Sequence, residues 1–388
     1  MSARGAARLA GGHLWVYRSD VVSAQAAAGD LVTVHDRRGR VLGSAFYSSA
    51  SEIALRLLSS RAVAESELAG LLRQRLEQAI DYRRRVVRDS NAFRLVFSEA
   101  DSLPGLIVDR YNDVLSLQIL TQSMDRAPVR QAVVDTLVER MAPAGIVERA
   151  EARIRQLEKL PPVTDRLLAG GKTATVVSMN GVRLHYDALA GQKTGAFLDQ
   201  RENYAAAAAW AHGDALDMFC YQGGFALHLA GVCRSVTGVD SSRPALEAAE
   251  RNAALNQAEG RPEIEWIEGN AFDLLKDYAA AGRQFDTIVL DPPAFARSRR
   301  SLPTALRGYK EINLRAMKML RPGGVLVTCS CSYHVSETEF METLRAAAAD
   351  AHRTLRVLER RGQAKDHPVM LSVPETAYLK CIILSVTY

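Results

Sequence analysis

Long apolar runs and cysteines are scarce in this sequence, and each shortage excludes a class of protein. No run of about 18 apolar residues occurs, so we expect no membrane-spanning helix. The first residues carry Arg4 and Arg8 but no apolar core behind them, so we expect no signal peptide. Five cysteines, an odd number in a long chain, argue against a disulfide framework and favour the reducing cytoplasm.

Excess charge of one sign is also limited. The formal net charge is +5, which permits nucleic-acid binding but does not require it. A chain of 388 residues with a hydrophobic fraction of 48% is too long for one core and favours two or three domains. The sequence shows no internal repeat, and it leaves the oligomeric state open, a homodimer included.

Residues 1–68 have the pattern of a small β-rich domain. Alternating segments at 30–35 and 41–46 flank a turn that reads Arg37-Arg38-Gly39-Arg40, which indicates a hairpin. Residues 53–58 predict a further strand. The region is either a structural cap or an RNA-docking module. The three arginines of the turn support the second interpretation, and the sequence leaves both open.

Residues 70–178 predict a second domain of strands and helices. A helix over 65–88 leads into it, with apolar side chains every four residues at Leu68, Leu72, Leu76 and Ile80. Its end carries a run of cations that suits a solvated helix end or contact with phosphate: Arg83, Arg84, Arg85 and Arg88. Strands are expected at 93–97, 106–109, 114–120 and 146–149, with a helix at 127–141 and a loop-rich linker at 161–171.

The stretch 212–241 reads as strand, glycine turn, helix, strand and acid, the pattern of a nucleotide-binding βαβ unit. Gly223 and Gly224 let the backbone turn sharply and come close to a ligand. The loop opens on Asp217 rather than glycine, which suits the cationic S-adenosylmethionine better than an anionic pyrophosphate. Asp240 can accept hydrogen bonds from both hydroxyls of a ribose. An ordinary βα turn is the alternative.

Strands alternate with helices through residues 179–388, which predicts a mainly parallel sheet with helices on both faces. Ligands of such sheets bind at the carboxyl ends of the strands. Five reactive or polar residues follow predicted strand ends: Asp217, Asp240, Asn270, Asp291 and Cys331. A purely structural role does not readily explain why five reactive or polar residues lie at one edge of the sheet, so this edge is the expected ligand site.

The corner Asp291-Pro292-Pro293 is the most specific of these strand ends. Two prolines continue neither a sheet nor a helix, so they fix a rigid turn after the acid. Many nucleic-acid methyltransferases grip an exocyclic amine with a similar corner. Ala294 separates the prolines from Phe295, which disfavours methylation of the N6 amine of adenine.

Cys331 suits methylation of a pyrimidine at carbon 5. That carbon becomes nucleophilic only when a thiolate adds to carbon 6. The other four cysteines are expected to be small buried hydrophobes: Cys220, Cys233, Cys329 and Cys381. The pair Cys329-x-Cys331 has no partner spacing for a metal, so no metal is expected.

Seven motifs carry a family resemblance: GQKTGAFLDQR at 191–201, DMFCYQGGFAL at 217–227, GVDSS at 238–242, DPPAF at 291–295, YKEIN at 309–313, TCSCS at 328–332 and DHPVM at 366–370. In this order they resemble the RlmI-type ribosomal RNA large-subunit cytosine-5 methyltransferases, and the likeness spans nearly the whole chain. It implies a PUA domain at 1–68, a central EEHEA-type α+β domain at 70–178 and a Rossmann-like α/β methyltransferase domain at 179–388. It also implies S-adenosylmethionine as donor and ribosomal RNA as partner.

The resemblance makes Cys331 the nucleophile, with Asp291 beside the base. The expected cofactor-binding residues are Phe197, Gln200, Arg201, Asp217, Phe219, Tyr221, Gly223, Gly224, Asp240, Ser241, Asn270, Ala271, Asp291 and Pro292. The expected substrate-binding residues are Pro293, Phe295, Arg297, Arg299, Arg300, Tyr309, Lys310 and His367.

Two expectations concern charge at this site. The arginines at 297–300 would contact phosphates next to the target base, unless they lie on a plain surface loop. A nearby cation should favour the thiolate of Cys331, and Lys310 and His367 are the candidates. The rival functions are an amino-group methyltransferase that needs no cysteine and a non-catalytic RNA-binding protein.

Overall fold

The computed structural model describes residues 1–189, 196–296 and 298–387, which form two compact units. The first unit holds residues 1–177 and two later segments that begin at Tyr186 and Lys365. The second holds residues 178–185, 196–364 and 377–387. The division of the first 178 residues into two domains stays a prediction. The return of the chain to the first unit at Lys365 was not expected from the sequence.

The start of the first unit is a four-stranded sheet beside a short helix. The strands are β1 (Trp15–Tyr17), β2 (Leu31–His35), β3 (Val41–Tyr47) and β4 (Ile53–Ser59), in the order β1-β4-β3-β2. The expected hairpin is present as the antiparallel pair β2–β3. Helix α1 (Ala3–Ala10) was not predicted, and it begins where the Ser2 hydroxyl accepts a hydrogen bond of 3.0 Å from the Gly5 amide.

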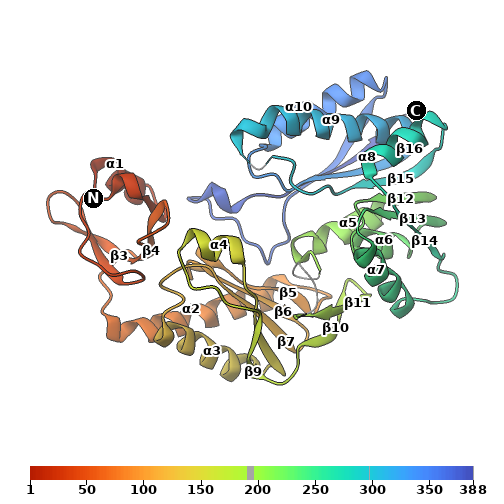
Figure 1. Ribbon diagram of the computed structural model, residues 1–388. Coiled ribbons are helices and arrows are strands. Elements are labelled where there is room, and N and C mark those ends of the chain that lie inside the picture. The colour runs from red at the N-terminus through yellow and green to blue at the C-terminus, as the bar shows by residue number, and fades with distance from the viewer. Residues whose placement is uncertain (190–195, 297, 388) are drawn as a thin grey trace. The chain divides into compact units, whose positions relative to one another are not determined.

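The rest of the first unit packs two helices against a five-stranded sheet (Figure 1). The helices are α2 (Glu65–Val86) and α3 (Ala127–Met141), and the sheet order is β5-β6-β7-β8-β9. Its strands are β5 (Ala92–Phe97), β6 (Leu106–Tyr111), β7 (Val114–Ile119), β8 (Gly145–Glu148) and β9 (Arg166–Gly170), with α4 (Ala152–Leu157) before the last. Strand β9 occupies part of the segment expected to be a linker.

The segment from Lys365 to Thr376 is anchored within the first unit. The Asp366 carboxylate accepts a hydrogen bond of 2.7 Å from the Arg94 amide, and the Asp366 carbonyl accepts one of 2.8 Å from the Arg83 guanidinium. The Arg83 side chain is fully buried and also pairs with Asp101. Thus Arg83, the first of the four arginines near the end of α2, holds internal structure rather than meeting solvent.

The second unit is built on a seven-stranded sheet in the order β14-β13-β12-β15-β16-β18-β17. The parallel strands are β12 (Asp214–Met218), β13 (Ser235–Asp240), β14 (Ile264–Glu268), β15 (Phe285–Leu290) and β16 (Leu320–Ser330). Strand β18 (Lys380–Val386) runs antiparallel between β16 and β17 (Leu355–Arg361). Strands β10 (Ala174–Met179) and β11 (Val182–Asp187) form a separate two-stranded sheet.

Helices cover both faces of the large sheet, as predicted (Figure 1). On one face lie α5 (Arg201–Trp210), α6 (Gly224–Leu229) and α7 (Arg243–Leu255). On the other lie α8 (Ala271–Ala280), α9 (Leu302–Met319) and α10 (Glu337–Asp350). None of the helices in the described ranges has the length and hydropathy needed to cross a bilayer. The strand order reverses at β12, so the crevice beside its carboxyl end is where a ligand is expected.

Candidate active site

In the turn after β12, close packing against aromatic rings requires glycine at positions 223 and 224. Phe219, Tyr221 and Gly223 adopt positive φ values of 66°, 49° and 85°. A Cβ atom on Gly223 would lie 2.9 Å from the Trp266 ring, and one on Gly224 would lie 2.6 Å from the Tyr204 ring. Because both distances are shorter than real contacts allow, these positions exclude larger residues whether or not a ligand approaches.

Asp217 places an unsatisfied carboxylate oxygen at the carboxyl end of β12. The side chain is fully buried, and its Oδ2 accepts a hydrogen bond of 2.9 Å from the Ala226 amide across the turn. Its Oδ1 is buried and has no hydrogen-bond partner among the described residues. Burial raises the pKa of Asp217 well above its ordinary value, and the charges of Asp291 and Asp240 add to the shift. A nearby positive charge would counter this rise, so the site suits a cationic donor such as S-adenosylmethionine better than an anion.

Asp240 is fixed at the carboxyl end of β13 by two backbone amides. Its Oδ2 accepts a hydrogen bond of 2.9 Å from Tyr221, and its Oδ1 accepts one of 2.9 Å from Ser242. Each oxygen keeps a further lone pair that a ribose hydroxyl could donate to. The neighbouring Ser241 is exposed.

Asn270 has a local structural role. Its Oδ1 accepts hydrogen bonds from the Phe272 amide at 2.9 Å and from the Asp273 amide at 3.4 Å, so it caps the start of α8. Ala271, the first residue of that helix, is buried. The cap explains this residue without a ligand, and a cofactor role for either residue stays a prediction.

The segment before α5 meets the Asp291 corner. Gln200, at the end of the 3-10 helix η3 (Leu198–Gln200), donates a hydrogen bond of 3.0 Å from its amide nitrogen to the Asp291 Oδ1. The Phe197 and Tyr221 rings lie 5.2 Å apart. Arg201 is buried. The first five residues of the GQKTGAFLDQR motif and Arg297 lie outside the described residues.

Cys331 lies against the loop that follows β15. Its Sγ is 3.8 Å from the Pro292 carbonyl oxygen. The adjacent Ser332 hydroxyl accepts a hydrogen bond of 3.1 Å from the Ala296 amide and lies 2.9 Å from the Tyr309 hydroxyl. The loops after β15 and β16 are therefore joined, and they bring Cys331 and the Asp291 corner together.

The other cysteines are buried, as predicted, and Cys331 alone of the five is partly exposed. Cys329 and Cys381 face each other across β16 and β18, both fully buried. Cys331 is therefore the cysteine that a substrate can reach.

The charges around Cys331 differ from expectation. Burial raises the pKa of Cys331 to about 11, and the carboxylates of Asp291 and Asp199 raise it further. Burial likewise raises the pKa of Asp291 to about 7, with Asp199 adding to the shift. A pKa near 11 favours the protonated thiol at neutral pH, which differs from the expected stabilised thiolate.

The cation that faces Cys331 is Lys380, at the start of β18. Its Nζ donates hydrogen bonds of 2.8 Å to the Ser332 carbonyl and 2.9 Å to the Tyr378 carbonyl, and its charge favours the Cys331 thiolate. Burial lowers the pKa of Lys380 to about 8. The expectation that Lys310 plays this part is wrong, because its ammonium lies 2.7 Å from Asp350 on α10. His367, the other candidate, belongs to the first unit, where it packs against Phe97.

The residues expected to bind substrate differ in solvent exposure, and some are exposed while others are buried. Pro293 is exposed, and so are Arg299 and Arg300 on the 3-10 helix η4 (Arg299–Ser301). Phe295 is half-buried, with its ring 4.6 Å from that of Tyr309. Tyr309 is fully buried and so cannot touch substrate in this state. Its hydroxyl instead supports the Ser332 side chain beside Cys331.

Sequence reasoning missed Asp199 and Lys380. The Asp199 carboxylate accepts a hydrogen bond of 2.7 Å from the Tyr378 hydroxyl. A signal for Lys380 was available, because it is a single lysine at the head of the apolar run Cys-Ile-Ile-Leu that follows it. Asp199 stood inside a motif already quoted, between two residues expected to bind the cofactor.

Two family models match this chain, one at its N-terminus and one over most of the remaining residues. A PUA-like domain model matches residues 1–60, and an S-adenosylmethionine-dependent methyltransferase model matches residues 101–384. Ribosomal RNA large subunit methyltransferase I of Alteromonas mediterranea is 37% identical over 381 residues, covering 97% of this chain and 95% of the relative. The protein of that name from Pseudoalteromonas translucida is 37% identical, covering 96% and 95%. The solved structure of SMU.776 complexed with SAH has a TM-score of 0.84 at 18% identity, covering 99% of this chain and 98% of that one.

Proposed function

Because this chain belongs to the S-adenosylmethionine-dependent methyltransferases, in the family of ribosomal RNA large subunit methyltransferase I, we propose that it forms 5-methylcytosine in large-subunit ribosomal RNA. The reaction would pass through a covalent adduct with Cys331. One observation carries this proposal: the partly exposed thiol of Cys331 lies beside the Asp291-Pro292 corner, 3.8 Å from the Pro292 carbonyl oxygen.

The donor would be held by the turn after β12 and the end of β13. Asp217 offers a buried carboxylate oxygen to the positively charged part of the donor, and Asp240 offers lone pairs to the ribose hydroxyls. Phe197 and Tyr221 provide neighbouring rings. When bound, S-adenosylmethionine supplies the electrophilic methyl group that carbon 5 takes.

Cys331 and Asp291 would act on the cytosine, once it is turned out of any stack. The Cys331 thiolate forms a bond to carbon 6, and the electrons of the C5–C6 double bond move toward N3. A neutral Asp291 donates its proton to N3 and accepts a hydrogen bond from the exocyclic amine. After carbon 5 is methylated, a base removes the proton from carbon 5 and the C5–C6 double bond re-forms. Cys331 leaves as thiolate, and N3 returns its proton to Asp291.

The pKa values support this assignment of protons. The pKa of Asp291 is raised to about 7, so near neutral pH this carboxyl holds a proton much of the time. Its negative charge is one cause of the raised pKa of Cys331. Protonation of Asp291 therefore favours the Cys331 thiolate, which then faces Lys380.

The test compares Cys329, which lies in β16, with Cys331, which lies in the loop that follows β16. Cys331→Ala should abolish methylation of stripped ribosomal RNA while calorimetry shows unchanged donor binding, and Cys329→Ala should keep most activity. RNA that contains 5-fluorocytosine should trap a covalent complex on the wild type, because the carbon 5 proton is replaced. An adduct that maps to Cys329 would refute the assignment of Cys331 as nucleophile. Methylation by Cys331→Ala would also refute it, and without an adduct it would favour an amino-group methyltransferase.

A further inference from the structure

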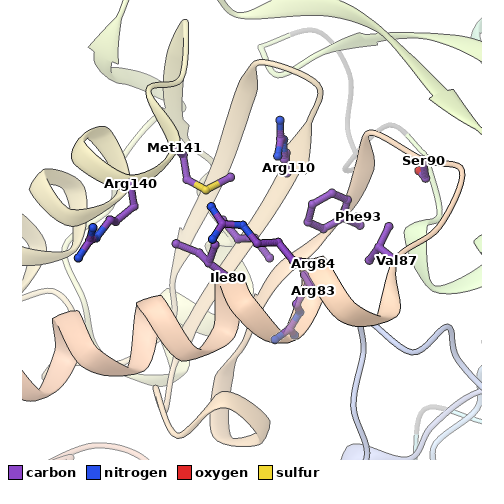
Figure 2. Close-up of a pocket in the computed structure, with 10 residues that line it drawn as sticks. Ile80, Arg83, Arg84, Val87, Ser90, Phe93, Arg110, Arg140 and Met141 are labelled. Atoms are coloured by element: carbon purple, nitrogen blue, oxygen red, sulfur yellow. The ribbon is translucent and has the colours of Figure 1, made fainter.

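A hollow lies in the first unit, whereas Cys331 and Asp217 lie in the second unit. It has a volume of about 350 Å³ and is lined by residues near the end of α2, on β5 and β6, and at the end of α3 (Figure 2). Small-molecule sites span about 300–1,000 Å³, so the hollow is large enough for one nucleotide. None of its lining residues is needed for the chemistry proposed above.

The lining combines an apolar floor with a cationic rim. The apolar side chains are Ile80, Val87, Phe93, Leu95 and Met141, and the cations beside them are Arg83, Arg84, Arg110 and Arg140. The guanidinium carbon of Arg110 lies 5.7 Å from the centre of the Phe93 ring. A bare phosphate would leave this floor uncovered, whereas a nucleotide has both an anionic and a flat apolar part.

Positive charge at this rim is incompletely balanced. The Arg110 Nε donates a hydrogen bond of 2.8 Å to the Asn112 carbonyl, and no carboxylate within the described ranges lies within 4.0 Å of its guanidinium. Burial lowers the pKa of Arg110, and the charge of Arg84 lowers it further. Among the described residues, Arg84 pairs with the exposed carboxylate of Asp81, and Arg140 pairs with the half-exposed carboxylate of Glu77, both on α2. A phosphate between Arg84 and Arg110 would relieve the repulsion between them.

A smaller hollow continues past Arg110. Its volume is about 180 Å³, and it shares Arg110 and Met141 with the first. Arg110 therefore stands between two adjoining hollows. Two hollows that share an arginine suit two successive units of a strand with a phosphate between them better than one free nucleotide.

We infer that these hollows bind an unpaired stretch of the RNA substrate, with a base on the apolar floor and its phosphate at Arg84 and Arg110. The inference rests on the proposed function in one respect, which is that the bound polymer is taken to be RNA. It assigns a role to the arginines near the end of α2, apart from Arg83, which is used internally.

Binding of a single-stranded RNA oligonucleotide across a salt series tests the inference. Arg84→Ala/Arg110→Ala should weaken binding and flatten the slope of log affinity against log salt by about 0.7, since both arginines contact one phosphate and each neutralised phosphate on a single strand contributes about 0.7. Arg251→Ala, which removes an exposed arginine from α7, is the matched control and should keep the wild-type slope. Thermal unfolding of each variant confirms that it is folded.

A cross-link locates the base. RNA that carries 4-thiouridine should cross-link to the peptide of Phe93 or Met141 in the wild type, and less so in the double arginine variant. An unchanged salt slope in the double variant, or cross-links confined to other peptides, would overturn the inference. Equal affinity for cytidine monophosphate and for the oligonucleotide would overturn its polymeric part. Cys331→Ala leaves this readout unaffected, so loss of methylation and loss of this site are distinguishable.

Discussion

The Gln200 side chain is oriented so that its amide nitrogen, not its oxygen, meets Asp291. Its oxygen accepts a hydrogen bond of 2.7 Å from Asn203, whose own oxygen accepts one of 2.9 Å from Arg361. The nitrogen is thereby left to donate to the Asp291 carboxylate at 3.0 Å. A chain of side chains that begins on β17 thus fixes the acid that is proposed to hold the base.

The raised pKa of Asp291 predicts a pH-dependent stability. In the folded state the pKa of the Asp291 carboxyl is about 7, whereas the ordinary pKa of an aspartate is 3.8. Between these values the folded state binds more protons than the unfolded state, so the free energy of unfolding should fall as pH rises, by up to about 1.4 kcal/mol per unit. Denaturant unfolding from pH 4 to 7 should show a smaller fall for Asp291→Asn than for the wild type. Parallel curves would contradict the assignment.

Asp240→Ala should weaken donor binding by about 1.5–3 kcal/mol, the range for hydrogen bonds to charged groups. Titration calorimetry with S-adenosylmethionine measures this loss. Glu247→Ala, at an exposed position on the neighbouring helix α7, serves as the control for local disturbance. Unchanged affinity in a folded Asp240→Ala protein would remove Asp240 from the donor site, and binding of NAD instead would point to a dehydrogenase.

Removing the cation of Lys380 should make Cys331 less reactive. Lys380→Met should slow alkylation of Cys331 by iodoacetamide at pH 7, where Lys380 is mostly charged, roughly tenfold, as expected for loss of one nearby opposite charge. Lys380→Arg should recover part of the rate. Mass spectrometry of the Cys331 peptide over a pH series gives the rates. Lys310→Met is the control, since Lys310 pairs with Asp350; an equal effect of both variants would argue for general destabilisation.

The turn after β12 should not tolerate a methyl group. Gly224→Ala places a Cβ atom 2.6 Å from the Tyr204 ring, and we expect a loss of about 1–3 kcal/mol of stability. Gly70→Ala is the opposite case, because Gly70 lies in α2 with open space around it, and there we expect a gain of about 0.5–1 kcal/mol. Urea unfolding of both variants measures the difference, and a neutral Gly224→Ala would show that Tyr204 can move aside.

Much of the fold was predictable because periodic patterns are local. The hairpin of β2 and β3, helix α2 and strand β15 were found where the apolar spacing indicated them. The PUA-like N-terminus, the Rossmann-like methyltransferase fold and the dependence on S-adenosylmethionine, which the motifs implied, are confirmed. Strand β9 was missed because prolines and glycines flank a short, partly exposed edge strand. Helix α1 was missed because small residues dominate it.

The electrostatics of the site were less accessible from sequence, because they depend on which strands pair. Lys380 faces Ser330 in the antiparallel register of β16 and β18, and this pairing places a late lysine next to Cys331. The raised pKa values of Cys331 and Asp291 come chiefly from burial, with Asp199 adding. None of these proximities follows from spacing along the chain.

The position of β18 has a consequence for synthesis on the ribosome. Strand β17 leaves the exit tunnel first, yet its only sheet neighbour in the described chain is β18, which also covers the edge of β16. A nascent chain that stalls between residues 361 and 380 therefore exposes the unpaired edge of β16 and leaves β17 without a partner, a state prone to aggregation and proteolysis. It also lacks Lys380. Strand β18 therefore completes the sheet and brings the Lys380 cation beside Cys331 in the same step. A product truncated before β18 lacks both the completed sheet and this cation.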